Sequence, residues 1–286
     1  MLDRIATIAA VIALPAALMM MTIDGARADD AKYPDWKGKW ERFAVRGLGT
    51  QPSHDQTKPW GFGQQAPLTP EYKAVLEASI ADQANGGLGN FPTTLGRPAG
   101  MPNMMMGFGP LEWVVTPDTT YVLIGWHDHY RRIFTDGRDW PAQIGPTFSG
   151  YSIGRWIDED GDGRYDVLEV ETRNFMGPRS FDNAGIPLHA DNETVIRERI
   201  YRDKRDPRVI HDEMTTIDHA LTRPWTVDKT YRLTDNPEFV QNICSVGNVH
   251  VVIGKDAYFL SAEGLLMPTK KGQGPPDLRY FRQTRQ

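Results

Sequence analysis

Apolar and polar residues alternate through most of the chain between residues 111 and 235, with the period of two that is typical of strands with one buried face. Short polar turns separate these runs, and no helical pattern comes between them. Eight successive strands are predicted, at 112–116, 120–127, 130–135, 150–157, 166–175, 193–202, 209–218 and 226–233. The pattern predicts a mainly β fold, an antiparallel barrel or sandwich, and gives no sign of a parallel α/β sheet.

The clearest helical pattern lies between residues 68 and 87. Thr69 is a good N-cap, and Pro70 suits the first helical position. Apolar residues then recur at helical spacing until Asn85-Gly86-Gly87 ends the helix. A short N-terminal helix is therefore expected beside the strands.

A Gly-, Pro- and Met-rich loop follows this helix and contains Met101, Met104, Met105 and Met106. Thioethers suit Cu(I), so a copper site is one interpretation of the cluster. The other is an apolar loop that plugs or covers a cavity, because methionine side chains adapt to irregular spaces. We favour the Met-rich lid.

The first 28 residues have the features of a signal peptide. Arg4 precedes an apolar run that Pro15 interrupts, and Ala26-Arg27-Ala28 is a cleavage site. An uncleaved anchor is the alternative, but the apolar run is marginal in length for that. We expect a periplasmic or secreted protein with no membrane anchor after cleavage. The predicted organisation is a signal peptide (1–28), an N-terminal extension with helix and lid (29–110), a barrel core (111–235) and a C-terminal helix, strand and tail (236–286).

Charge and cysteine content narrow the classes of partner. The net charge is −5 and the pI is about 5.8, which argues against nucleic acid as a partner. Cys244 is the only cysteine, so the chain has no internal disulfide, and a small buried role suits this residue better than a reactive one.

The run from Asp158 to Glu169 places carboxylates at alternate positions before Gly163. Ca²⁺ takes six to eight oxygen ligands in flexible geometry, and the spacing matches an EF-hand loop in full. The flanking segments are predicted strands, however, so we expect a structural Ca²⁺ site on a β-hairpin. The alternative is an acidic turn without metal. The expected ligands are Asp158, Asp160, Asp162, Asp166, Glu169 and the backbone carbonyl of Arg164.

Histidines offer a second kind of chemistry. His127 and His129 share a face if their strand is continuous, and two imidazoles can bind Zn²⁺, Fe²⁺ or Cu²⁺. His189, or a carboxylate from Glu193, Glu198 or Glu213, can supply the third ligand. The alternative, which we favour, is that Asp128-His129 is a polar turn that leaves His127 alone.

Glu198 lies in a strand with charged residues on both faces. A buried charge has to be paired, and Arg132, Arg138, Arg155 and Arg197 are available for Glu169, Glu171, Glu198 and Glu213. One interpretation is an interior ion pair. The other is a general acid or base beside His189 and His127 above a bound substrate.

A set of motifs occurs in a fixed order along residues 68–225: Pro67-Leu68-Thr69-Pro70-Glu71-Tyr72, Gly100-Met101-Pro102, 131–138, 149–156, 168–172, 185–189 and Arg223-Pro224-Trp225. In this set the chain resembles a broad family of exported bacterial proteins with a lipocalin-like fold. The resemblance implies export and a β-barrel, and it leaves the chemistry open. The acidic loop that begins at Asp158 is longer than the tight turn usual in that family. The residues beside Cys244 also lack the acidic residue that the family commonly has next to its cysteine.

These observations favour an antiparallel lipocalin-like barrel that binds a small lipophilic ligand. A general acid/base enzyme (a lyase, isomerase or hydrolase) using His127, His189 and Glu198 is the alternative, and a structural envelope protein is a third hypothesis.

Overall fold

The computed structural model describes residues 31–42, 53–90, 93, 97–107, 109–127, 129–239, 250–260 and 265–277. The predicted signal peptide and Cys244 lie outside these residues.

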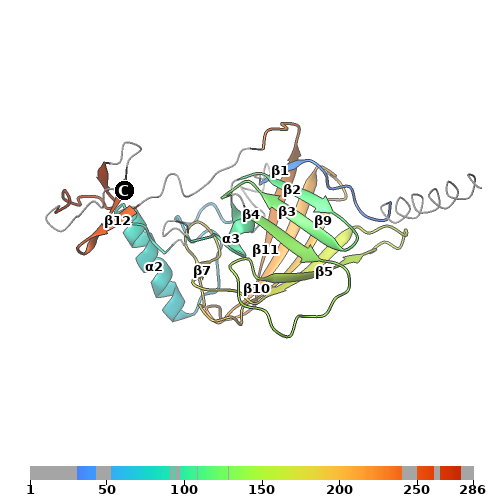
Figure 1. The fold of residues 1–286 in the computed structure, drawn as a ribbon, viewed down its shortest axis with the longest axis horizontal. Helices are drawn as coiled ribbons and strands as arrows, with labels where there is room; N and C mark the ends of the chain where they lie inside the picture. The colour runs from blue at the N-terminus through green and yellow to red at the C-terminus, as the bar shows by residue number, and fades with distance from the viewer. Residues whose placement is uncertain are drawn as a thin grey trace, which may run out of the picture.

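A closed β-barrel forms the body of the protein (Figure 1). The strand order is β1-β11-β10-β9-β6-β5-β4-β3-β2. The strands are β1 (Lys39–Arg42), β2 (Leu111–Val115), β3 (Thr119–Ile124), β4 (His129–Phe134), β5 (Tyr151–Ile157), β6 (Val167–Arg173), β9 (Val195–Arg202), β10 (Val209–Ile217) and β11 (Trp225–Thr234). All eight predicted strands are present, so the predicted mainly β barrel is confirmed.

The ninth strand, β1, closes the barrel by pairing with both β11 and β2. It begins after Gly38, whose φ of 104° lies in the region that glycine tolerates best. Trp40 is fully buried, and its indole nitrogen donates a hydrogen bond of 2.9 Å to the carbonyl of Trp36. Four residues are too few for alternation to identify a strand, which is why the prediction stopped at eight.

One pair of strands departs from the expected antiparallel pattern. β4 and β5 run parallel, with Ile133 opposite Ser152 and Phe134 opposite Ile153. A tight turn can join only antiparallel neighbours, whereas a longer connection can carry the chain back to the starting end. Residues 135–150 form such a connection, so the barrel is mixed.

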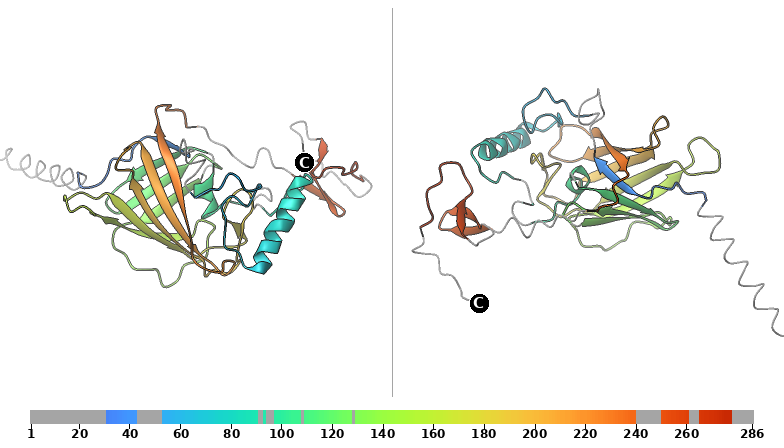
Figure 2. Two further views of the ribbon diagram at one scale, coloured as in Figure 1. Left: turned by 180° about the vertical axis from the view of Figure 1, so that it is seen from behind. Right: turned by 90° about the horizontal axis from the view of Figure 1, so that it is seen from above.

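The predicted helix is α2 (Pro70–Ala84), with Thr69 as its N-cap. It lies outside the barrel, near a small sheet formed by β12 (His250–Ile253), β13 (Asp256–Leu260) and β14 (Leu266–Pro268) (Figure 2). The short pair β7 (Arg179–Ser180) and β8 (Pro187–Leu188) contacts α2. A C-terminal helix was expected from residue 237, but residues 237–239 are not helical and the rest of it lies outside the described residues. No described helix has the length and apolar character needed to span a membrane.

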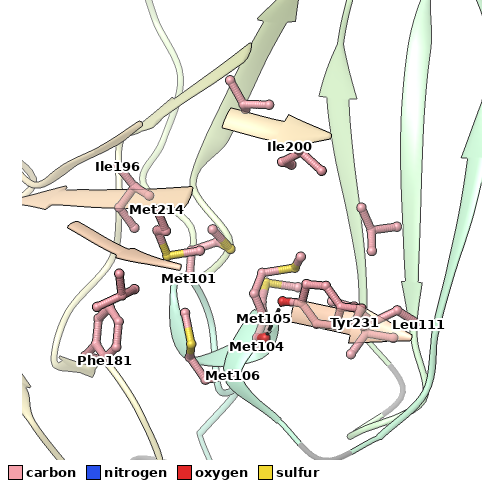
Figure 3. Close-up of a cluster of buried hydrophobic side chains, with 14 of the residues drawn as sticks. Met101, Met104, Met105, Met106, Leu111, Phe181, Ile196, Ile200, Met214 and Tyr231 are labelled. Atoms are coloured by element: carbon pink, nitrogen blue, oxygen red, sulfur yellow. Dashed lines mark hydrogen bonds between the residues drawn. The ribbon is translucent and has the colours of Figure 1, made fainter. Parts of the chain in front are cut away.

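The Met-rich loop lies inside the protein. It contains the one-turn helix α3 (Asn103–Met106), whose methionines are about 1% exposed, as is Met101. Their side chains point toward Met214, Tyr231 and other side chains of the barrel core (Figure 3). We call Met101, Met104, Met105 and Met106 the Met plug.

Candidate functional site

An ion pair inside the barrel is the first feature of the candidate site. Arg131 of β4 and Glu198 of β9 are both almost completely buried. The guanidinium donates from Nη1 to Oε1 of Glu198 at 2.7 Å and from Nη2 to Oε2. Two parallel hydrogen bonds of this kind are the strongest arrangement between these groups.

The same guanidinium joins four neighbouring strands. Its Nε donates to Ser152 Oγ of β5 at 3.2 Å, and its Nη2 donates to Thr172 Oγ1 of β6 at 2.8 Å. The surrounding carboxylates hold the pKa of Arg131 above its ordinary value despite burial. This network is the structural interpretation considered for Glu198, although the partner is an arginine that was not among those expected.

Two of the four expected arginines lie on the outer face of the barrel and pair there with glutamates that were also considered as their partners. Arg155 donates to Glu169 at 2.8 Å, and Arg197 donates to Glu171 at 2.8 Å. Arg131 could have been recognised because it alternates with Ile133, an apolar residue that faces the core.

Asp212 of β10 is the second feature, and it is fully buried beside the ion pair. Burial and the negative charge of Glu198 raise its pKa well above the ordinary value, so the carboxyl favours its neutral form. Among the described residues, neither of its oxygens has a hydrogen-bond partner. Buried polar groups are usually satisfied, so this carboxyl is an exception that calls for an explanation.

Lys229 of β11 lies directly opposite Asp212 in the register of the two strands. Its ammonium group is fully buried and donates to Oε1 of Gln64 at 2.9 Å. Burial, followed by the positive charge of Arg42, lowers its pKa to about 8. Asp182 lies nearby, and its burial raises the pKa of its carboxyl.

The barrel interior thus holds a carboxyl and an amine whose pKa values have moved toward neutrality from opposite sides. Groups with pKa values shifted in this way are typical of sites that transfer protons. Sequence reasoning missed both groups, although Asp212 alternates with the buried residues Ile210 and Met214. We call Arg131, Glu198, Asp212 and Lys229 the interior charge cluster.

The Met plug closes over this interior through a few polar contacts. Tyr231 donates its hydroxyl to the Met105 carbonyl at 2.8 Å, and Arg42 donates to the Met106 carbonyl. The plug has no side-chain N-cap, and it lies between Gly100 and Gly107. A Cβ on Gly107 would lie 2.2 Å from the Trp126 ring, so only glycine fits there.

The three predicted catalytic residues have different partners. Glu198 pairs with Arg131, whereas His189 contacts Asp191 and His219 just after β8. His127 packs on the Trp126 ring with a centroid distance of 4.2 Å, and burial lowers its pKa to about 4. Among the described contacts, none joins any two of these three residues.

His127 and His129 do not lie on one continuous strand. β3 ends at Ile124, β4 begins at His129, and His127 has a φ of 61°. This break agrees with the polar-turn interpretation of the pair.

The acidic loop joins β5 to β6 as expected, so strands and not helices flank it. Carboxylate oxygens of Asp158, Asp160 and Asp162 lie within 4.8 Å of one another. Gly163 has a φ of 87°, which allows the predicted bend. Asp166 also points its carboxylate into the loop region, accepting a hydrogen bond of 2.9 Å from the Glu159 amide.

The oxygen-only donors of this loop fit Ca²⁺, and Oδ2 of Asp166 is buried with no hydrogen-bond partner in the described part of the chain. Glu169, the expected twelfth ligand, instead forms its ion pair with Arg155 on the outer face. Arg164 lies in the same loop, with its amide hydrogen-bonded to Asp162.

A groove of about 640 Å³ lies between Trp140 and the outer faces of the strands β5, β6, β9, β10 and β11. Its lining is mostly charged and contains the ion pairs of Glu169 and Glu171.

No protein-family model matches the chain, and comparison with curated proteins gives no match.

Proposed function

We propose that this protein is an exported, calcium-stabilised β-barrel that binds a small lipophilic ligand in the barrel interior. The observation that carries the proposal is the carboxyl of Asp212, which has no hydrogen-bond partner among the described residues and lies between the other residues of the interior charge cluster and the Met-rich core. Ligand sites are commonly apolar with a few converging polar groups. The preferred ligand has an apolar body and one hydrogen-bond donor that reaches Asp212.

The Met plug supports this proposal because it is the part of the core most easily replaced. Methionine is flexible and adapts to irregular neighbours, and one turn of helix has little stability of its own. A ligand would take the position of the plug against Ile196, Ile200 and Met214, which form the facing wall.

The first experiment is native mass spectrometry of the mature protein purified from its host, together with titration of N-phenyl-1-naphthylamine, a neutral apolar probe. We expect a co-purifying small molecule and saturable probe binding that this molecule displaces. The proposal would be contradicted if no molecule co-purifies and the probe shows no saturable binding.

Met105→Ala and Met267→Ala provide a matched pair of variants. Met105 is buried in the plug, whereas Met267 of β14 is 49% exposed. Removing a buried methionine costs about 2–5 kcal/mol, and a ligand that fills the space recovers part of this loss. We expect the probe to raise the melting temperature of Met105→Ala more than that of Met267→Ala. Equal shifts would place the probe outside the barrel.

A second candidate function is a general acid/base enzyme acting on the same ligand. It is favoured by the raised pKa of Asp212 beside Lys229, whose pKa is lowered to about 8. Asp212→Asn should then retain ligand binding and lose turnover, whereas a binding protein shows no conversion in either form. Chromatography of the ligand after incubation with each protein separates the two functions.

Export and calcium belong to the same proposal. Cleavage after Ala28 predicts a mature N-terminus at Asp29, which N-terminal sequencing of the native protein tests. Detection of Met1 in a membrane fraction would exclude cleavage.

A further inference from the structure

Two histidines and a carboxylate meet at the surface, away from the interior charge cluster. His189 and Asp191 follow β8, and His219 follows β10. Oδ2 of Asp191 lies 3.0 Å from Nδ1 of His189 and 2.6 Å from Nδ1 of His219. One ligand atom from each of the three residues lies within 4.8 Å of the others.

Nδ1 of His189 has two competing neighbours. It accepts a hydrogen bond of 3.1 Å from the Asp191 amide, so this nitrogen carries a lone pair there. The Asp191 carboxylate oxygen faces the same nitrogen at 3.0 Å. With Nδ1 unprotonated, these two atoms both present lone pairs. A cation bound between them would use the Nδ1 lone pair in place of the amide contact and attract both atoms.

A buried carboxylate fixes the two segments that carry these histidines. Asp218 accepts hydrogen bonds from the His189 amide at 2.9 Å and from the Ala220 amide at 2.8 Å. It also accepts from Thr194 Oγ1 at 2.6 Å, and its side chain is fully buried. The positions of both histidines are therefore set by the fold and do not depend on a flexible surface loop.

We propose that His189, Asp191 and His219 form a binding site for a divalent transition-metal ion of the zinc type. Two imidazoles and one carboxylate suit Zn²⁺ and its neighbours, whereas Ca²⁺ takes oxygen ligands. Ligands of a tetrahedral ion at about 2.1 Å lie roughly 3.4 Å apart, which small side-chain rotations achieve here. His219 is 60% exposed, so an ion can enter from solvent.

Glu193 faces the opposite ring nitrogen of His219. Its Oε2 lies 3.8 Å from Nε2 of His219, whereas Asp191 contacts Nδ1. The ion therefore has three protein ligands, and one position stays open to water, as in catalytic zinc sites.

The test is isothermal titration calorimetry with ZnCl₂ on the mature protein, purified without a histidine tag and freed of metal. We expect one Zn²⁺ per chain at this site. His219→Gln and Asp191→Asn should each weaken binding by more than about 100-fold, because losing a ligand exceeds the loss seen for outer-shell residues.

Two control variants separate this site from other metal-binding groups. His211 contacts Asp228 through Nδ1 and Asp203 through Nε2, so the two carboxylates lie on opposite sides of the ring and do not converge on one point. His211→Gln should leave zinc binding unchanged, and so should Asp160→Ala with Asp162→Ala in the acidic loop. The proposal would be overturned if the wild-type protein does not bind zinc, or if His219→Gln binds it as tightly as wild type. Loss of zinc binding in the acidic-loop variant would also overturn it.

X-ray absorption at the zinc edge of the wild-type complex provides a measurement that needs no variant. A first shell with two imidazole nitrogens supports the site, and an oxygen-only shell excludes it. The zinc site does not depend on a ligand in the barrel, so failure of the ligand proposal would leave it intact.

Discussion

Lys229 gives the sharpest test of the electrostatics of the barrel interior. Its ammonium group is fully buried, with Gln64 as its hydrogen-bond acceptor. Burial is the largest influence and lowers its pKa from the ordinary value of 10.5 to about 8; Arg42 lowers it further, and Asp182, Asp212 and Asp228 oppose the change. Because the pKa of Lys229 differs between the folded and unfolded states, we expect the free energy of unfolding to depend on pH.

The sign follows from proton binding. Between about pH 8 and 10.5 the folded protein has released the Lys229 proton, whereas the unfolded chain retains it. The unfolded state therefore binds more protons, and stability rises with pH across this range. At about 1.4 kcal/mol for each pH unit, the contribution of the buried lysine amounts to about 3 kcal/mol.

The perturbation is Lys229→Met, which keeps the length of the buried chain and removes the titrating group. Urea unfolding of both proteins across this pH range gives their difference in free energy of unfolding. We expect wild type to gain about 3 kcal/mol on the variant between about pH 8 and 10.5. Lys73→Met, at an exposed position on α2, is the control and should give a curve parallel to wild type. A constant difference between wild type and Lys229→Met would refute the description of Lys229.

Three further predictions concern ion pairs and the loop. Glu198→Gln should lower the free energy of unfolding by about 3–5 kcal/mol because it leaves Arg131 buried without its counter-charge. The exposed control Glu169→Gln should lower it by less than about 1 kcal/mol. Equal losses for the two variants in urea unfolding would contradict this prediction. EGTA should lower the melting temperature, since a ligand at a hundredfold excess over its Kd adds about 3 kcal/mol, and Asp160→Ala with Asp162→Ala should abolish the response. The pKa of His211 is raised chiefly by its hydrogen bond to Asp228, so its contribution to the free energy of unfolding is complete below pH 6.5 and is lost as pH rises through the folded-state pKa. His211→Gln should therefore flatten the pH dependence of urea unfolding in this range, and an unchanged slope would contradict the prediction.

The strands of the barrel could be predicted from sequence because alternation is a local property. The eight predicted strands match the structure closely at their ends, and α2 has the N-cap and first-turn proline that the sequence indicated. The parallel pairing of β4 with β5 could not be predicted, since it depends on the path of residues 135–150. β1, with only four residues, was too short to show a period.

The candidate site was less predictable because it depends on which strands become neighbours. Alternation places Arg131 and Asp212 inside the barrel, but it does not show which inward carboxylate lies within reach of which cation. Only the order β4-β5-β6-β9 brings Arg131 to Glu198. The same limit applies to His189 and His219, which come from separate connections and meet through Asp191.

The composition of the barrel interior is itself an argument for a role beyond stability. Apolar residues of similar volume in place of a buried ion pair are often neutral or stabilising, and an unpartnered carboxyl such as Asp212 adds a further cost. Arg131 and Glu198 satisfy each other, so they account for a rigid frame across four strands without needing Asp212. Asp212 and Lys229 do not complete that frame, and each has a pKa moved by burial. Residues that lower stability persist where function requires them, so we propose Asp212, and not the ion pair, as the residue that recognises the ligand.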